Sequence, residues 1–278
     1  MFDAQPHPIL QRVQGRAEVR LKAGPEGAAV PDRLRQEGSA KAILSRGRSA
    51  ADPREVVFLN TAGGLTGGDR LSYGLDLARG LTATGTTQTA ERAYSAAAGG
   101  TARMEVRLTV GAGGWLDWLP QETILFDGAA LDRETMVDLA PGAGCLMLET
   151  VILGRHAMGE EIEGVHLRDL RRVERAGRPV WSEPLMLDTR VMGRRHAPAI
   201  LGGARAFATL ALIRPDAGDL LAPLQAVLDQ PEVEAAASAM DGRLVLRMIA
   251  WDGLPLRRQI ARALGVLRPG PLPRVWAL

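Results

Sequence analysis

The chain has 278 residues, of which 46% are hydrophobic and only 4% aromatic, and its formal net charge is +2. This apolar content is enough for one sizeable core or two smaller ones, and without a dense basic run nothing indicates nucleic-acid binding. No apolar run approaches the roughly 20 residues that cross a bilayer, and the single cysteine excludes an internal disulfide and is typical of a reducing compartment. We therefore expect a cytoplasmic protein that binds neither nucleic acid nor membrane.

Short strands separated by glycine-rich turns dominate the first two-thirds of the sequence. Period-two alternation or β-branched content predicts strands at residues 18–22, 56–59, 71–77, 82–89, 102–110, 115–119 and 145–152. Residues 168–175 mix both charges, and we interpret them as a solvated strand pair or a loop. This pattern favours an all-β architecture.

Helix signals concentrate in the last third. Asp219 precedes apolar residues at helical spacing, and Pro231 ends that pattern, so we expect a first helix between them. A strand at 243–251 follows, and Pro255 then opens a second helix whose apolar stripe is Leu256, Ile260 and Leu264. The predicted fold is one β-rich domain over residues 1–278 with two helices in its C-terminal third.

The most informative segment is residues 60–69, with the sequence Asn-Thr-Ala-Gly-Gly-Leu-Thr-Gly-Gly-Asp. Its Gly-Gly pairs predict at least one positive φ, and Asp69 should accept hydrogen bonds from N–H groups of its own turn. A P-loop would need Lys and Ser or Thr after the last glycine, and a dinucleotide fingerprint would need a helix there, but Asp69 and Arg70 precede a strand pattern. Two interpretations remain: a structural turn between antiparallel strands, or a flat backbone surface that contacts another molecule.

Residues suited to catalysis are sparse. The four histidines show no metal-ligand spacing, and Cys145 lies in an apolar strand pattern, as a buried small hydrophobe would. Glu122 and Asp127 flank residues 124–126, and a glycosidase needs such a pair at opposed positions. Their spacing within one strand would place them on opposite faces. An all-β carbohydrate-active hydrolase or lyase that uses this pair is kept as the alternative function.

Three motifs, in this order, resemble one family. Residues 60–69 resemble the N-x-A-G-G-x-x-G-G-D signature of the urease accessory protein UreD, also called UreH. Residues 86–95 resemble the T-T-Q-x-A-x-K-x-Y-R stretch of that family, with Arg92 in place of Lys and Ser95 in place of Arg. Residues 118–126 resemble its segment of an aromatic residue, Leu, Pro and Gln or Asp before an apolar run, although Glu122 stands where many relatives have Pro. The similarity covers nearly the whole chain.

The resemblance implies a mainly β fold, with short strands in a layered, helicoid, solenoid-like arrangement and two helices. It also implies a non-catalytic chaperone of urease maturation, which acts as a scaffold for UreF and the GTPase UreG on the urease apoprotein and assists nickel delivery. The loop residues with a structural or partner-contact role are Asn60, Gly63, Gly64, Gly67, Gly68 and Asp69. The residues of the other two motifs are Thr86, Thr87, Gln88, Arg92, Tyr94, Leu119, Pro120 and Gln121.

Nickel chemistry indicates how the metal is handled. Ni²⁺ favours imidazole ligands, and the sequence has no His or Cys cluster, so we expect no tightly bound cofactor and only transient contact with Ni²⁺. Carboxylates suit a path that must release its metal, and the candidates are Glu91, Glu122, Asp127 and Glu149. A purely structural binding module without a metal role is a third alternative.

Two apolar segments are candidates for contact with a helical partner. Trp115 and Trp118 are expected to be buried, because Trp is highly buried on average. The proline-rich tail 271–278 is expected to be exposed, because chain ends are seldom part of a core. We therefore expect the tail to support partner binding without being needed for the β fold.

Overall fold

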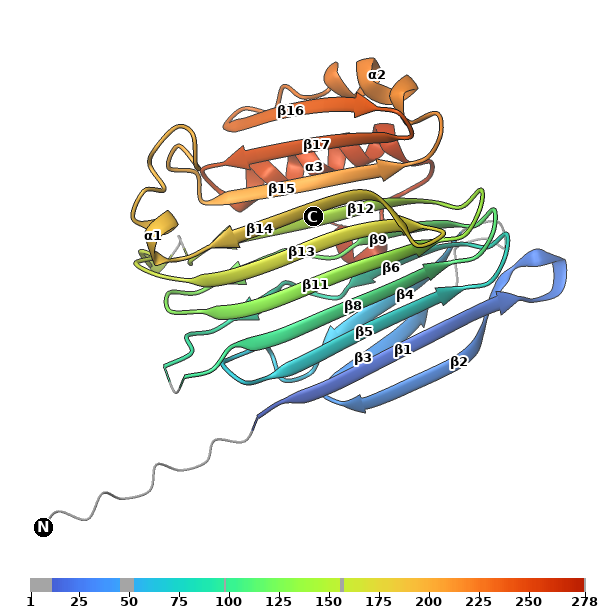
Figure 1. Cartoon of the computed structure of the whole chain (residues 1–278), viewed down its shortest axis with the longest axis horizontal. Coiled ribbons are helices and arrows are strands. Elements are labelled where there is room, and N and C mark those ends of the chain that lie inside the picture. The colour runs from blue at the N-terminus through green and yellow to red at the C-terminus, as the bar shows by residue number, and fades with distance from the viewer. Residues whose placement is uncertain (1–11, 46–52, 98, 156–157, 278) are drawn as a thin grey trace, which may run out of the picture.

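Two β-sheets pack against each other in the structure, a computed structural model that describes residues 12–45, 53–97, 99–155 and 158–277 (Figure 1). The first sheet has the order β14-β13-β11-β8-β5-β1-β2. Its strands are β1 (Gln14–Ala23), β2 (Ala29–Gly38), β5 (Arg70–Leu77), β8 (Ala102–Val110), β11 (Ala130–Leu139), β13 (His166–Arg175) and β14 (Arg178–Leu187).

The second sheet has the order β16-β17-β15-β12-β9-β6-β4-β3, with β7 and β10 paired beside it. Its strands are β3 (Ala40–Ser45), β4 (Arg54–Asn60), β6 (Thr82–Thr87), β7 (Glu91–Ala93), β9 (Trp115–Leu119), β10 (Thr123–Leu125), β12 (Gly144–Leu153), β15 (Ala206–Ile213), β16 (Val233–Met240) and β17 (Arg243–Ala250).

The chain winds between the two sheets. Between β4 and β13 it passes repeatedly from one sheet to the other. The neighbours β5, β8, β11 and β13 pair in parallel in the first sheet, as do β4, β6, β9 and β12 in the second. This winding confirms the layered, solenoid-like β fold that the family resemblance implied.

A large apolar core fills the space between the sheets. Phe58 is fully buried in this core, and its ring centroid lies 4.8 Å from that of Tyr73 and 5.9 Å from that of Trp118. Cys145 and Trp118 are buried, as predicted, whereas Trp115 is half-buried and donates from Nε1 to Asp117. A second apolar core lies on the other face of the second sheet. Strand β12 is therefore buried on both faces, which explains its continuous apolar sequence.

Helix α3 (Gly253–Leu267) covers the outer face of the second sheet and confirms the second predicted helix. Asp252 caps its start by accepting a hydrogen bond from the Leu254 N–H at 3.1 Å. Leu256, Ile260 and Leu264 are buried against the sheet, as their spacing predicted. Among the described residues, none of the helices has both the length and the apolar character needed to cross a bilayer.

The first predicted helix is much shorter than the sequence pattern indicated. Only α2 (Leu221–Gln225) is α-helical, and Asp219 lies in a preceding 3-10 turn, η3 (Ala217–Leu220), so it does not cap the helix. The buried side chain of Gln259 donates to Val227 O at 2.9 Å and accepts from Gln230 N at 3.0 Å. Through these tertiary hydrogen bonds, Gln259 binds backbone groups of residues 227 and 230, which follow α2, instead of these groups continuing the helix. The one-turn helix α1 (Thr189–Met192) was not predicted, and η1 (Pro25–Gly27) is a further 3-10 turn.

The C-terminal tail is attached to the fold, so its predicted exposure was wrong. Trp276, in the 3-10 turn η4 (Arg274–Trp276), is 4% exposed and donates from Nε1 to Leu119 O at 3.0 Å. The Arg257 guanidinium lies 4.6 Å from the centre of the Trp276 ring, and Gln121 Nε2 donates to Val275 O at 3.1 Å. These contacts tie the chain end to β9 and α3.

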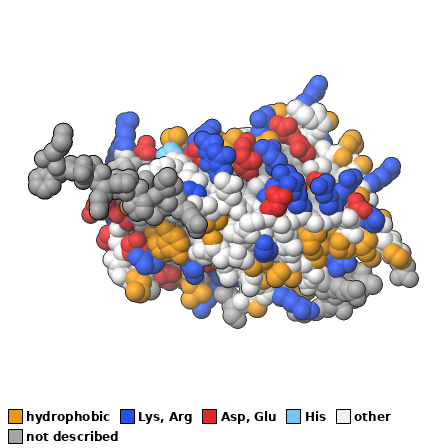
Figure 2. All heavy atoms as spheres, turned by 90° about the horizontal axis from the view of Figure 1, so that it is seen from below, with side chains coloured by type: hydrophobic (Ala, Val, Ile, Leu, Met, Phe, Trp, Pro, Cys, Tyr) orange, Lys and Arg blue, Asp and Glu red, His pale blue; other side chains and the backbone are white. Residues whose placement is uncertain are grey.

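Basic and acidic side chains lie close together on the surface seen from below in Figure 2. The strands of the first sheet carry exposed pairs of the same kind, such as Arg16 with Glu18 and Arg107 with Glu105. Exposed pairs of this type contribute little to stability. They keep the open face of a largely parallel sheet polar.

Candidate functional site

The glycine-rich loop crosses from one sheet to the other. It leaves β4 in the second sheet and enters β5 in the first, and these two strands are not paired. The interpretation as a turn between antiparallel strands was therefore wrong. Sequence adjacency suggested a hairpin, but the winding of the chain places consecutive strands in opposite layers.

Backbone conformation accounts for three of the four loop glycines. Gly63, Gly64 and Gly68 have φ values of 79°, 153° and 89°, which confirms the predicted positive φ. Gly67 has no positive φ, but a Cβ there would lie 2.7 Å from Gly100 O. The loop therefore needs glycine for conformation at three positions and for close approach at the fourth.

Asp69 fixes the end of this loop, as predicted. It is 2% exposed, and its Oδ2 accepts from the Thr66 N–H at 2.8 Å within its own turn. Its Oδ1 accepts from the Val13 N–H, also at 2.8 Å. The same carboxylate therefore closes the loop and anchors the residue that precedes β1.

Asn60 and Glu91 join the first motif to the second. Asn60 Nδ2 donates to Glu91 Oε1 and to Gly64 O, both at 3.2 Å, and its Oδ1 accepts from Ala62 N at 3.1 Å. Burial raises the pKa of Glu91 to about 7, against a smaller lowering effect of the Asn60 hydrogen bond. Asn60 and Glu91 therefore connect the two motifs through a partly buried carboxyl group.

An aromatic cluster borders the loop on its outer side. Tyr94 OH donates to Gly63 O at 3.2 Å, and a Cβ at Gly64 would collide with the Tyr94 ring. The Tyr94 and Phe126 rings meet edge to face with centroids 4.8 Å apart, and the Arg155 guanidinium lies 4.6 Å above Phe126. Tyr94 is 38% exposed, so this part of the loop is accessible from solvent.

The second and third motifs are held together by hydroxyl groups. Thr86 Oγ1 donates to Leu119 O at 2.6 Å, and Thr87 Oγ1 accepts from the Gln121 N–H at 2.9 Å. Gln121 Oε1 in turn accepts from Arg257 at 2.6 Å. Of the other motif residues, Pro120 is buried, and Gln88 and Arg92 are exposed. The structure therefore brings the three motifs side by side, although they are far apart in the sequence.

The four carboxylates proposed for a nickel path do not converge on one point. Each is held by a different partner. Glu91 contacts Asn60, and Glu122 lies 3.3 Å from Arg257. Asp127 accepts hydrogen bonds from the Glu163 and Gly164 N–H groups at 2.8 and 3.0 Å, and Glu149 lies 2.8 Å from Arg133. Within the part of the chain that the structure describes, no group of three or more His, Cys, Asp or Glu side chains is arranged to hold a metal ion.

The alternative catalytic pair, Glu122 and Asp127, is not arranged as that function requires. Strand β10 covers only Thr123–Leu125, so both carboxylates lie outside the strand that was expected to carry them. Glu122 lines a cavity next to α3, and Asp127 is not among the residues that line it. Asp127 Oδ1 instead accepts two backbone hydrogen bonds from residues 163 and 164.

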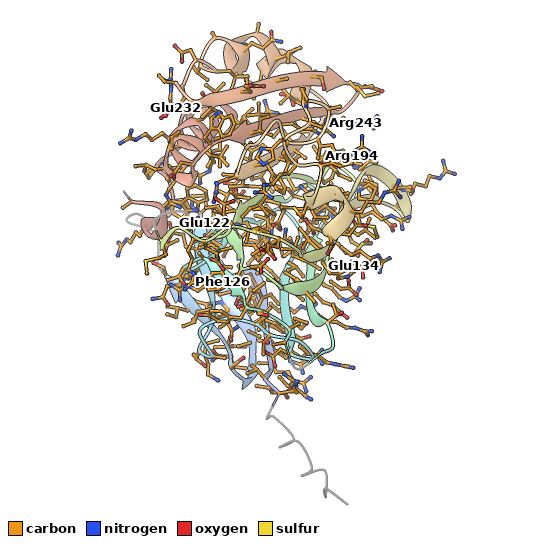
Figure 3. The ribbon with its side chains drawn as sticks, turned by 90° about the vertical axis from the view of Figure 1, so that its left-hand side faces the viewer. Glu122, Phe126, Glu134, Arg194, Glu232 and Arg243 are labelled. Carbon is orange, nitrogen blue, oxygen red and sulfur yellow. The ribbon has the colours of Figure 1, made fainter. Side chains whose placement is uncertain are left out.

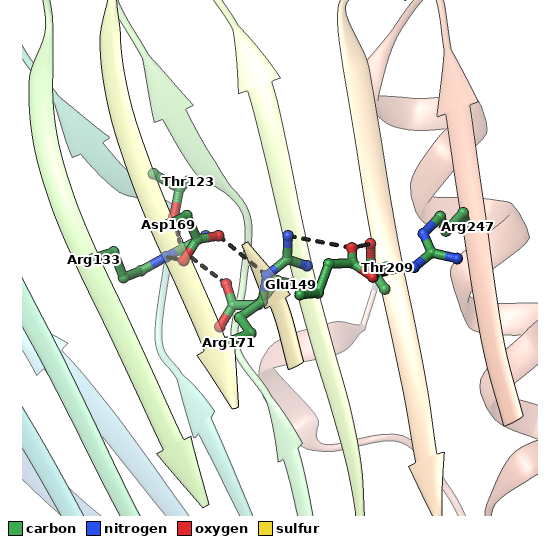
Figure 4. Close-up of polar contacts among 8 residues, drawn as sticks. Thr123, Arg133, Glu149, Asp169, Arg171, Thr209 and Arg247 are labelled. Atoms are coloured by element: carbon green, nitrogen blue, oxygen red, sulfur yellow. Dashed lines mark hydrogen bonds and ion pairs between the residues drawn. The ribbon is translucent and has the colours of Figure 1, made fainter. Parts of the chain in front are cut away.

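A buried network of charged residues connects the two sheets, and the sequence analysis did not predict it (Figure 4). Arg133 Nε and Nη2 donate to Asp169 Oδ1 and Oδ2 at 3.0 and 2.7 Å, and Arg133 Nη1 lies 2.8 Å from Glu149 Oε2. Arg133 Nη1 also donates to Thr123 Oγ1 at 2.8 Å. The Arg133, Asp169 and Glu149 side chains are 3%, 0% and 4% exposed.

The network continues to the edge of the first sheet. Arg171 Nε lies 3.3 Å from Asp169 Oδ2, and Arg171 Nη2 lies 3.5 Å from Glu183 Oε1. Glu183 accepts from Thr209 Oγ1 at 2.8 Å and pairs with Arg247. Burial raises the pKa of Glu149. Burial would also raise the pKa of Asp169, but the charge and hydrogen bonds of Arg133 and the charge of Arg171 together outweigh it, so the pKa of Asp169 is lowered.

Asp169 and Arg171 show why the sequence analysis missed this network. We interpreted residues 168–175 as solvated, because mixed charges are usually exposed. In β13, however, both side chains point to the same buried face as Leu167 and Val173. Side chains alternate between the two faces of a strand, so Asp169 and Arg171 share a face with the apolar residues Leu167 and Val173. This alternation in the sequence could have predicted their burial.

The fold and its loop define a class of two-sheet, solenoid-like β proteins with a glycine-rich crossing between the sheets. Residues 13–277 match the family described as UreD urease accessory protein. The chain is 59% identical over 271 residues to "Urease accessory protein UreD" of one strain of Cereibacter sphaeroides, a match that covers 98% of this chain and 97% of that protein. It is 58% identical over 276 residues to the protein of the same name from Paracoccus denitrificans, with 99% and 96% covered. The chain belongs to the UreD family.

Proposed function

We propose that this protein acts in urease maturation as a non-catalytic chaperone. It holds UreF and the GTPase UreG on the urease apoprotein in the cytoplasm, and it assists the delivery of nickel to the urease active site. Membership of the UreD family over residues 13–277 supports the accessory role. The hydrogen bonds that join the three motifs to one another support the scaffold role.

The observation that carries the nickel role is the environment of Glu91. Its carboxylate is held by the neutral amide of Asn60, and burial raises its pKa to about 7. Near neutral pH this group can therefore exchange its proton for a divalent cation. A single carboxylate beside a backbone carbonyl such as Gly64 O binds Ni²⁺ weakly compared with several imidazoles. Weak binding suits a cargo that must be released to urease.

The test is maturation of urease in a host without its own urease genes. The urease subunits are expressed with UreF and UreG, with or without this chain, and nickel per purified urease is measured together with activity. We expect nickel content and activity to be at least about tenfold lower without the chain. Equal nickel loading with and without the chain would refute the proposal.

Two further comparisons separate the parts of this function. Glu91→Gln is compared with Glu105→Gln, because Glu105 is an exposed glutamate on the first sheet. We expect only Glu91→Gln to lower nickel loading while UreF and UreG still copurify. If the chain raises the yield of assembled urease without changing nickel per assembled subunit, it is a purely structural binding module.

A further inference from the structure

Strand β16 (Val233–Met240) ends the second sheet, and it is the uppermost strand in Figure 1. One of its edges pairs with β17 along all eight residues without a register shift. Among the described residues, no strand pairs with its other edge. In Figure 3, Glu232, which precedes β16, and Arg243, which begins β17, lie above Glu122 and Phe126. The free edge therefore lies away from the third motif, and it presents backbone N–H and C=O groups to which another strand can pair.

The other three strands that end the two sheets carry features that block such pairing. Strand β2 contains Pro31, and β14 contains Pro179 and Pro184, and proline has no N–H group to donate. Strand β3 has only six residues and carries Lys41. Strand β16 has the sequence Val-Glu-Ala-Ala-Ala-Ser-Ala-Met, with neither proline nor a basic residue. Of these four described strands, β16 is the one whose edge is left open.

The register shows which backbone groups of β16 point to the free edge. Just before β15, Leu153 N–H donates to Arg205 O at 2.7 Å, and just after it, the residue 214 N–H donates to Gly242 O at 3.1 Å. Odd-numbered residues of β15 therefore face β12, and even-numbered ones face β17. Through the pairing of the strands, even-numbered residues of β16 face β17, and odd-numbered ones face away from it. The residues that face the free edge are Val233, Ala235, Ala237 and Ala239.

This edge is complementary to itself in an antiparallel register. With Ala236 opposite the partner's Ala236, Ala235 lies opposite the partner's Ala237, and both present backbone groups that face outward. Glu234, the only charged residue of β16, then lies opposite the partner's Ser238, whose hydroxyl can donate to the carboxylate. A shift by one residue would set outward-facing groups against groups already bonded to β17. Backbone and side chains therefore favour the same alignment.

Side chains on both faces of β16 suit this pairing. Residues 235–239 are all alanine or serine, so a second strand can approach without displacing large side chains. The odd-numbered side chains are half-buried against the second apolar core, and the even-numbered ones are exposed. A strand added at this edge therefore needs apolar side chains toward that core and small or polar ones toward solvent. Strand β16 itself has this alternation, so the occupant that fits is a second β16.

We propose that two copies of this chain form a symmetric dimer by antiparallel pairing of their β16 strands, with Ala236 on the two-fold axis. The two ten-stranded sheets then become one continuous sheet. The three motifs lie away from this interface, because they border β4, β6 and β9, in the other half of the strand order. The dimer goes beyond the proposed function and does not depend on it.

An introduced cysteine tests the axis, because the native Cys145 is fully buried and is the only cysteine of the chain. Opposed residues of a non-hydrogen-bonded antiparallel pair have Cα atoms about 4.5 Å apart, a separation that a disulfide can span. Under mild oxidation, we expect Ala236→Cys to give at least about tenfold more disulfide-linked dimer on non-reducing gels than Ser182→Cys, an exposed position of β14.

A third cysteine variant tests the register. Ser238→Cys should crosslink as little as Ser182→Cys, because each Ser238 lies opposite the partner's Glu234 and not opposite the partner's Ser238. Equal crosslinking at positions 236 and 182, or stronger crosslinking at 238 than at 236, would overturn the proposal.

Ala237→Pro weakens the pairing through the backbone. It removes an N–H group that faces the free edge, so the hydrogen bonds with β17 are retained. By symmetry the dimer loses two hydrogen bonds, and each contributes a factor of roughly five, so we expect its dissociation constant to rise about 30-fold. Light scattering of the purified full-length chain over a range of concentrations measures this constant. An unchanged constant in a variant with the wild-type circular dichroism spectrum would contradict the pairing.

Ala236→Lys disrupts the dimer through an exposed side chain, independently of the backbone. It places two like charges opposite each other on the axis, which destabilises a strand pair. Met186→Lys is the matched control, because Met186 is 57% exposed on the edge strand β14. We expect light scattering to show a monomer for Ala236→Lys and a dimer for Met186→Lys and wild type. A monomeric wild type, or equal dimerisation of the two lysine variants, would show that β16 is not the interface.

Discussion

Removing the negative charge of Asp169 should strongly destabilise the fold. The side chain of Asp169 is 0% exposed, and three nitrogen atoms of Arg133 and Arg171 lie within 3.3 Å of its oxygens. Asp169→Asn keeps the shape of the side chain but leaves two guanidinium groups near a carboxylate, Glu149, whose pKa burial raises. The substitution therefore creates an excess of positive charge between the sheets.

The magnitude follows from the burial. Two unit charges about 4 Å apart interact by roughly 4 kcal/mol at an effective dielectric constant of about 20. Breaking a buried pair by removing one partner costs about 3–5 kcal/mol. Asp32 provides the control, because its carboxylate lies 2.9 Å from Lys22 Nζ but its side chain is 34% exposed. Asp32→Asn should change the unfolding midpoint little, because exposed ion pairs contribute little to stability.

Urea unfolding at pH 7, followed by far-UV circular dichroism, measures both variants against wild type. We expect the unfolding midpoint of Asp169→Asn to fall well below that of Asp32→Asn, without a change in the native spectrum. If the two variants unfold within about 1 kcal/mol of each other, the buried network does not stabilise the fold as argued.

The other predictions concern the loop, the tail and pH. Because the pKa of Glu91 is raised to about 7, its folded form loses stability as pH rises from about 4.5 through 7. Glu91→Gln should therefore be more stable than wild type at pH 8 and similar at pH 5 in thermal melts; equal melting temperatures at pH 8 would contradict this. Gly64→Ala should cost about 1–3 kcal/mol, because its φ is 153° and a Cβ would lie 2.7 Å from Arg92 O. Gly265→Ala, in an open position of α3, should instead stabilise by about 0.5–1 kcal/mol in the same urea titration. Deleting residues 271–278 should lower the melting temperature by several degrees, since it removes the buried Trp276; an unchanged melting temperature would show that the tail is dispensable.

Much of the candidate site could be predicted because its signals are local. The glycine pattern predicted positive φ in residues 60–69, and the Asx chemistry of Asp69 predicted its hydrogen bond to Thr66. The raised pKa of Glu91 could not be predicted, because it depends on burial by strands that are distant in the sequence. The tail was also misplaced, since Leu119 and Arg257, which hold Trp276, are far from it along the chain.

The sequence by itself determined the β-rich class, most of the strands in the first two-thirds and helix α3 with its buried stripe. Each of these depends on side-chain periodicity or turn chemistry within a few residues. Only the tertiary structure decided which sheet each strand joins, that residues 60–69 cross between the sheets and that Asp169 and Arg171 are buried. Strand pairing and the compensation of a buried charge both join residues far apart in the chain. A local pattern shows which residues lie on one face of a strand, but it does not show which other strand or helix packs against that face.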